Sequence, residues 1–192
     1  MLNTNILDLY TDYLLTSFSA VTATGLSAAV NEQYSHDQIT RFLAKEDASQ
    51  KSYWQMIKPV VRQIEQDDGI VVVDDTIEEK PSTDENEMVC WHDDHTTGQN
   101  VKGINLVNFL YQVERPDQSD MSLPLAYEVV SKPETVVDAK TGKTKRKSTV
   151  SKNTLVRDRL KILRFQNQIR FAYVVFDSWF SSKDNMTLIR TE

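Results

Sequence analysis

The stretch DGIVVVDDT at residues 68–76 decides the fold of this chain of 192 residues. Residues 70–73 are an apolar, β-branched run without polar alternation, which is the pattern of a strand buried on both faces of a sheet. The run ends directly in two acids, Asp74 and Asp75. The sequence therefore predicts a core strand that carries carboxylates at its carboxyl end.

A second apolar run that ends in an acid lies about a hundred residues further along the chain, where residues 171–176 (FAYVVF) precede Asp177. The elements predicted between and after the two runs are strands at 88–91, 106–113 and 123–130, of which the last two pair as a hairpin, a helix capped by Asn153, and a short helix over 183–189. This order of strands and helices is that of an RNase H-like sheet.

In an RNase H-like sheet, the first strand and the strand after the first helix lie side by side and parallel. We therefore expect Asp74 and Asp177 to meet at one edge of the sheet. Two carboxylates in this position are suited to Mg²⁺, because hard cations prefer oxygen ligands. A pair of such ions stabilises the negative charge on the entering and leaving oxygens of a phosphodiester. The pattern predicts a metal site for phosphodiester chemistry.

The residues before Gly69 read as helices. Apolar spacing predicts one helix over 4–18 and another from Ser49, with Pro59 inside it. Ser35 and Gln38 form a capping-box pattern, which predicts a helix that begins directly after Ser35. The small-residue segment 19–30 fits either a loop or a weakly specified helix.

The predicted fold class is mixed α/β (α+β), in two regions. Residues 1–68 form a helical N-terminal region, and residues 69–192 form an incomplete RNase H-like domain with a mixed sheet.

Charge is distributed unevenly along the chain, although the net charge is only −6. Residues up to Gln99 hold six basic and eighteen acidic side chains (−12), and the rest hold sixteen and ten (+6). The run KTGKTKRK at 140–147 is too polar for an element of its own, so we expect an exposed loop that contacts phosphates or is simply solvated. The candidate DNA contacts are Lys143, Lys145, Arg146, Lys147, Arg157 and Arg159.

Composition excludes some classes of protein. The one cysteine, Cys90, cannot form an internal disulfide, and no run approaches the roughly 18 apolar residues of a membrane span. No secretory leader is recognisable, so a cytoplasmic location is expected. Cys90, His92 and His95 have the spacing of half a zinc site but no second cluster, and their role stays open.

Four stretches resemble the DDE transposases of bacterial insertion sequences: DGIVVVDDTIEEKP (68–81), NVKGINLVNFLY (100–111), SLPLAYEVV (122–130) and FAYVVFDSWFSSKDNM (171–186). The resemblance runs from about Ser35 to the last residue. In that family the first acid stands in an Asp-x-Thr setting, which matches Asp74, with Asp75 as the adjacent alternative. The second acid precedes an x-aromatic-Phe sequence, which matches Asp177.

The resemblance implies that Asp74 and Asp177 are catalytic residues that bind Mg²⁺ or Mn²⁺ for DNA strand cleavage and transfer. The family's third acid, a Glu on a later helix, has no matching segment, and only Asp184 and Glu192 follow Asp177. We therefore expect a transposase truncated before its third acid and inactive alone. The alternatives are a regulatory fragment that binds DNA or a partner without catalysis, and a complete small metal nuclease.

The resemblance also implies the partners. They are the DNA of the element ends and of the target, together with a second copy of the chain or an intact transposase. The helical region 1–68 resembles the family's end-recognition region in position and helicity, so its two expected roles are recognition of DNA ends and a purely structural role. With DNA as a partner, we expect the protein to be cytoplasmic and associated with the nucleoid, and we expect no membrane partner.

Overall fold

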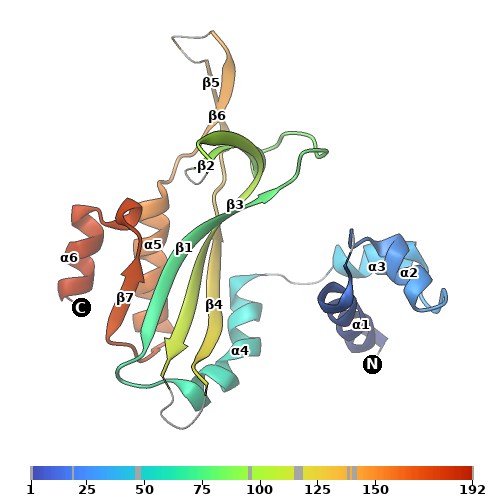
Figure 1. Ribbon diagram of the computed structural model, residues 1–192, viewed down its shortest axis with the longest axis horizontal. Helices are drawn as coiled ribbons and strands as arrows, with labels where there is room; N and C mark the ends of the chain where they lie inside the picture. The colour runs from blue at the N-terminus through green and yellow to red at the C-terminus, as the bar shows by residue number, and fades with distance from the viewer. Residues whose placement is uncertain are drawn as a thin grey trace. The chain divides into compact units, whose positions relative to one another are not determined.

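The chain folds into two compact units, residues 1–49 and 50–192. The computed structural model (Figure 1) describes residues 2–18, 20–45, 49–94, 97–114, 119–137, 139 and 142–191. His95, Lys140 and Glu192, which the sequence analysis considers, lie outside these residues. Within the described residues, no helix is both long and apolar enough to cross a membrane.

The first unit consists of three helices, α1 (Leu2–Thr16), α2 (Ala23–Ala29) and α3 (His36–Leu43). They enclose a small core of their own, formed by Ile6, Leu26, Tyr34, Ile39 and Phe42. The capping box predicted at the start of α3 is confirmed, with both reciprocal hydrogen bonds between Ser35 and Gln38 present. The segment that fits either a loop or a helix contains α2, whose first turn is capped by the Thr22 hydroxyl.

The second unit is a mixed sheet with helices. Its strands are β1 (Ile70–Glu79), β2 (Val89–Asp94), β3 (Gln99–Val113), β4 (Met121–Val129) and β7 (Tyr173–Phe176), and its helices are α4 (Gln50–Ile64), α5 (Lys152–Lys161), a π-helical turn (Ile162–Gln166) and α6 (Lys183–Thr191). The strand order is β2-β3-β1-β7. Strand β4 also pairs with β3, along residues 106–113, whereas β2 pairs with residues 99–104 of the same strand. The prediction of a mixed α/β fold is confirmed, and the element order agrees with an RNase H-like fold.

The pairing of β1 with β7 is the feature on which the sequence argument depends. The two strands lie parallel, with Val71 opposite Val174 and Val73 opposite Phe176. The predicted hairpin is also present, because β3 and β4 pair antiparallel. One expectation is wrong: β1 is not buried on both faces, since Val71 and Val73 are buried but Ile70 and Val72 are only half-buried. Strand β1 also continues to Glu79.

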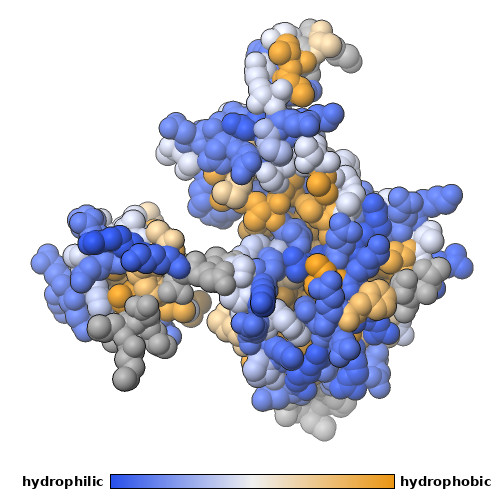
Figure 2. Space-filling model, turned by 180° about the vertical axis from the view of Figure 1, so that it is seen from behind, coloured by the Kyte–Doolittle hydropathy of each residue, from blue (hydrophilic) through white to orange (hydrophobic). Residues whose placement is uncertain are grey.

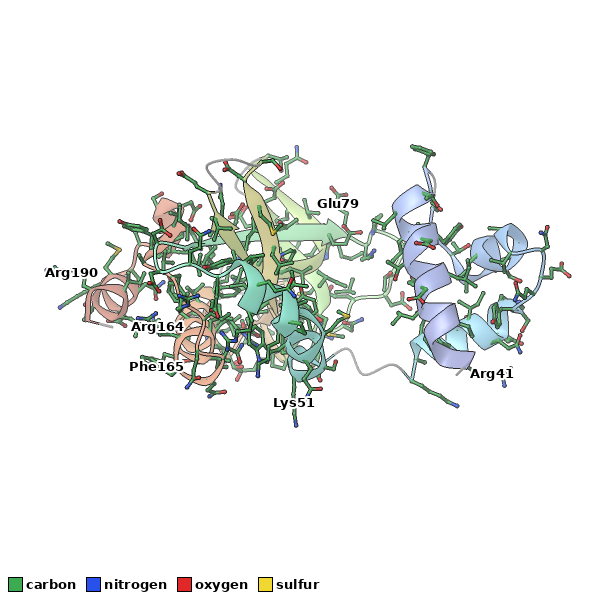
Figure 3. The ribbon with its side chains drawn as sticks, turned by 90° about the horizontal axis from the view of Figure 1, so that it is seen from below. Arg41, Lys51, Glu79, Arg164, Phe165 and Arg190 are labelled. Carbon is green, nitrogen blue, oxygen red and sulfur yellow. The ribbon has the colours of Figure 1, made fainter. Side chains whose placement is uncertain are left out.

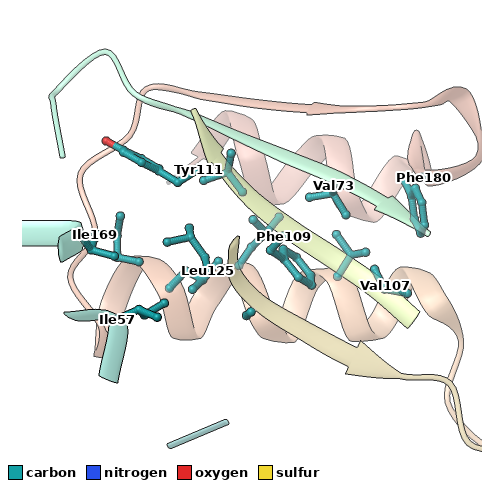
Figure 4. Close-up of a cluster of buried hydrophobic side chains, with 14 of the residues drawn as sticks. Ile57, Val73, Val107, Phe109, Tyr111, Leu125, Ile169 and Phe180 are labelled. Carbon is teal, nitrogen blue, oxygen red and sulfur yellow. The ribbon is translucent and has the colours of Figure 1, made fainter. Parts of the chain in front are cut away.

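The core lies on one face of the sheet, beneath helices α4 and α5 (Figure 4). Alternate residues of the central strands point into it, as the two-residue period of a strand requires. The strand residues are Val71, Val73, Val107, Phe109, Tyr111 and Val113, and the helices contribute Ile57, Val61, Val156 and Leu160. On the opposite face, Tyr173 and Val175 of β7 are exposed.

Residues 144–147 form a strand, so the prediction of an irregular loop there is wrong. Strand β6 (Thr144–Lys147) pairs antiparallel with β5 (Glu134–Val137) in a separate two-stranded sheet. The β-branched residues of β5 supply the strand propensity that the basic run lacks, and Glu134 stands opposite Lys147. The hairpin projects away from the main sheet (Figure 1), and apolar surface is visible at its end in Figure 2.

Candidate metal site at the ends of two parallel strands

Asp74 and Asp177 are brought together by the register of β1 and β7. Val73 and Phe176 are the last paired residues of the two strands, and each is followed directly by one of the acids. Both acids are exposed, whereas Val73 before Asp74 is buried in the core. Alternation along a strand therefore places both carboxylates at the same level on the face opposite the core.

Each of the two carboxylates is oriented by a backbone N–H group. The Asp75 N–H donates to Oδ1 of Asp74 at 2.8 Å. The Trp179 N–H donates to Oδ1 of Asp177 at 3.1 Å, so that Asp177 caps the short 3₁₀ turn Ser178–Phe180. Among the described residues, nothing donates a hydrogen bond to Oδ2 of either acid, which leaves these oxygens accessible to a cation.

Asp75, the alternative to Asp74, lies in a different environment. Its Oδ2 accepts from Lys152 Nζ of α5 at 2.5 Å and from Asn105 Nδ2 of β3 at 3.2 Å. Asn105 is fully buried, which places the Asp75 carboxylate that it contacts on the helix-covered face of the sheet. The Asp75 carboxylate is therefore already neutralised by an ion pair, and the arrangement favours Asp74 as the partner of Asp177.

A cavity of about 370 Å³ opens beside the two acids, and its lining is strongly acidic. It is lined by Asp74, Asp75, Thr76, Ile77, Asp93, Asp94 and Asp177. Asp93 and Asp94 of β2 were not predicted, although two adjacent acids that close a strand are visible in the sequence. In register, Asp93 stands opposite Asn100 of β3 and Asp74 opposite Asn108, so the two acids occupy distant parts of the lining.

The donor set fits a hard divalent cation. Mg²⁺ is commonly held by one or two protein carboxylates, with water and substrate phosphate oxygens completing its coordination. Asp74 and Asp177 supply two such carboxylates. No group of three or more His, Cys, Asp or Glu side chains suited to a metal ion occurs within the described residues.

The structure separates the basic residues considered as DNA contacts. Lys145 and Lys147 are exposed on one face of the β5–β6 hairpin, and Lys143 is exposed just before it. Arg146 points the other way, where its Nε lies 3.5 Å from Glu85 Oε1. These lysines and Arg146 therefore do not form one continuous surface.

The two arginines of α5 are engaged within the protein. Arg159 is only 9% exposed and donates from Nε to Glu128 Oε1 at 2.6 Å. Arg157 donates to Asn185 Oδ1 at 2.9 Å and to the Thr154 hydroxyl at 3.1 Å. Both guanidinium groups are thus held by partners within the protein, and their contact with DNA phosphates stays a prediction.

Cys90 and His92 form a buried pair on the helix-covered side of β2. Sγ of Cys90 lies 3.4 Å from Nε2 of His92. Burial, together with the positive charges of Lys132 and Lys152, lowers the pKa of His92 from 6.5 to about 4. Burial raises the pKa of the Cys90 thiol and lowers that of Lys132. Near neutral pH the imidazole is uncharged.

The low pKa of His92 predicts a loss of stability in mild acid. The unfolded state takes up a proton below pH 6.5 and the folded state only near pH 4, so stability falls as the pH drops through this window. Between pH 7 and 4.5 we expect the free energy of unfolding to fall by about 2 kcal/mol more in the wild type than in His92→Gln. Urea unfolding followed by tryptophan fluorescence measures it, since Trp54, Trp91 and Trp179 all lie in the second unit.

The control for this prediction is His36→Gln, because His36 is exposed on α3 of the other unit. This variant should keep the full pH dependence of the wild type. Equal pH dependence in His92→Gln and the wild type would contradict a buried neutral imidazole.

A mixed sheet in which an aspartate directly follows the paired segment of each of two adjacent parallel strands is the frame of RNase H-like enzymes that act on phosphodiesters with divalent metal ions. Comparison with known proteins agrees with this class. The model of the family described as DDE superfamily endonuclease matches residues 4–191, and the chain belongs to this family. The match extends to the N-terminal helices, beyond the resemblance that starts near Ser35. No curated protein and no solved structure gives a match.

Proposed function

We propose that the chain is a transposase of an insertion sequence, in which Asp74 and Asp177 hold Mg²⁺ or Mn²⁺ at the DNA phosphate that is cut and joined. The observation that carries the proposal is the placement of these two acids directly after Val73 and Phe176, the last paired residues of the parallel strands β1 and β7. Membership of the DDE endonuclease family supports DNA as the substrate, and enzymes of this family are typically metal-dependent. The bound metal would stabilise negative charge on the reacting phosphate oxygens.

The chain's own residues supply orientation and charge at this site. The backbone N–H groups of Asp75 and Trp179 hold one oxygen of each catalytic carboxylate, so the other oxygen can face a cation without rearrangement. Asp93 and Asp94 add negative charge to the same cavity, which disfavours a bare phosphate until a cation is bound. We infer that metal binding precedes productive binding of DNA at the site.

Two further regions are proposed to contact DNA. The β5–β6 hairpin presents Lys145 and Lys147 on one exposed face, with Lys143 beside it. In the first unit, α3 exposes Gln38, Thr40 and Arg41 (Figure 3), and Arg41 Nε donates to the Asp37 carbonyl of the same helix at 3.2 Å. An exposed polar helix face with an arginine suits recognition of DNA ends by residues 1–68.

The test of this function uses the full chain, a DNA duplex and Mn²⁺. We expect the chain to bind Mn²⁺ and the duplex but not to cut the duplex alone, because Asp74 and Asp177 are the only facing acids that we assign to the metal. Failure to bind Mn²⁺ would overturn the proposal. DNA binding without metal binding would favour the regulatory alternative, and cutting that requires both acids would reveal a complete nuclease.

The contribution of the hairpin can be measured from the salt dependence of DNA binding. Each lysine that neutralises a phosphate contributes about 0.9 to the slope of log K against log salt concentration. Lys145→Gln/Lys147→Gln is expected to reduce this slope by about 2. Lys51→Gln/Lys58→Gln is the matched control, because both lysines are exposed on α4 and Lys51 points away from the unit (Figure 3). An equal reduction in both variants would exclude a specific role of the hairpin.

A further inference from the structure

The start of α5 contacts both strand ends that carry the acids. Lys152, its first residue, reaches β1 through the ion pair of Nζ with Asp75 Oδ2 at 2.5 Å. The Asp75 N–H in turn holds the Asp74 carboxylate, so Lys152 acts one residue away from the proposed ligand.

On the side of β7, the same helix start reaches the turn after Asp177 through Asn185 of α6. The Asn185 amide nitrogen donates to Asn153 Oδ1 and to the Phe180 carbonyl oxygen, both at 2.8 Å. Its oxygen accepts from Arg157 at 2.9 Å. The Phe180 N–H donates to the Asp177 carbonyl at 3.2 Å, which closes the turn.

Because the network is buried, each of its polar groups needs a hydrogen-bond partner within the protein. Asn185 is 0% exposed, and both ends of its amide are used in hydrogen bonds. Removing one partner of a buried polar group leaves the other unsatisfied, which costs more than the hydrogen bond itself contributes. Loss of any one partner is therefore expected to weaken the remaining hydrogen bonds of the network.

We infer that Lys152, Asn153 and Arg157, here called the α5 bridge, are positioning residues that fix the separation of Asp74 and Asp177. The bridge pins the end of β1 through Asp75 and the end of β7 through Asn185. This gives Arg157 a role in place of a DNA contact. The inference rests on the proposed function for its consequence in metal binding, but its structural part can be tested without a metal.

The first experiment measures backbone NMR order parameters in the full chain without metal. Rigid backbone has an order parameter near 0.85 and flexible backbone below about 0.6. In Asn185→Ala we expect the values of Trp179 and Phe180 to fall from the rigid towards the flexible range. Arg62→Met is the matched control, because it removes the Arg62–Glu65 ion pair at 2.9 Å and the hydrogen bonds of Arg62 to the carbonyls of Asn167 and Gln168, none of which involves the network of Asn185. Arg62→Met should leave the order parameters of Trp179 and Phe180 unchanged. A general loss of stability, without loss of the Asn185 network, is expected to leave them unchanged in the same way.

The second experiment measures Mn²⁺ affinity by electron paramagnetic resonance at a temperature well below unfolding. Asn185→Ala should weaken binding five- to tenfold, and Arg62→Met should not change it. Lys152→Met/Asp75→Asn removes the other arm of the bridge at constant net charge and should weaken binding to a similar extent. If Asn185→Ala does not fold, Asn153→Ala removes one bond of the network and should show both effects in weaker form.

The outcomes separate the inference from the proposed function. Unchanged order parameters at Trp179 and Phe180 in a folded network variant would overturn the bridge, whether or not the wild type binds Mn²⁺. Absence of Mn²⁺ binding by the wild type would overturn the proposed function and leave the order parameters as the deciding measurement for the bridge.

Discussion

Asp177→Asn is expected to reduce the affinity of the chain for Mn²⁺ by about 100-fold or more. Asparagine has the shape of aspartate, and its side-chain oxygen can still accept from the Trp179 N–H, so the 3₁₀ turn should persist. The substitution removes only the charge of one of two proposed ligands. Loss of groups that merely orient a metal ligand already costs 10- to 100-fold in affinity, so loss of a charged ligand should cost at least as much.

Asp158→Asn is the matched control for Asp177→Asn. Asp158 is an exposed acid on α5, and its substitution changes the net charge by the same amount. Titration calorimetry should give the control the affinity of the wild type. An equal loss in both variants would show that Mn²⁺ responds only to overall charge, and no loss in Asp177→Asn would remove Asp177 from the site.

The parallel pair of strands was predictable because its signals are local. Each strand is an uninterrupted apolar run, and an acid follows each run directly, at Asp74 and Asp177. The order of the elements is that of an RNase H-like sheet, in which the two runs are neighbours, and the observed register pairs them in this way.

The choice between Asp74 and Asp75 could not be made from sequence. Adjacent residues of a strand point to opposite faces, and the sequence does not say which face receives the helices. Our proposal of Asp74 rests on the ion pair of Asp75 with Lys152, which is 77 positions from Asp75 along the chain. The acidic lining from Asp93 and Asp94 likewise depends on how the distant strand β2 is placed.

The prediction for the arginines of α5 shows a limit of helical periodicity. As a candidate DNA contact, Arg159 was expected on the solvated side of its helix, because charged residues normally lie there. In the structure Glu128 of β4 neutralises Arg159, so the helix can bury this position. A charged residue with a buried partner cannot be distinguished from an exposed one by pattern alone.

Phe109→Ala is expected to lower the free energy of unfolding of the second unit by about 3 to 5 kcal/mol. Phe109 is 1% exposed and lies in the middle strand of the sheet, opposite Val73 on one side and Ala126 on the other. Its ring fills the space between the sheet and α5 (Figure 4). Neighbours on two paired strands cannot move inward without disturbing hydrogen bonds, so the cavity should remain largely open.

Phe165→Ala tests whether this effect comes from burial and not from loss of a phenyl ring as such. Phe165 is 53% exposed and follows α5 in the π-helical turn (Figure 3). Its substitution should cost less than about 1 kcal/mol. Urea unfolding followed by tryptophan fluorescence again reports on the second unit alone. Equal losses in the two variants would contradict the position of Phe109 at the centre of the core, because the cost of truncation follows the contacts that a side chain loses.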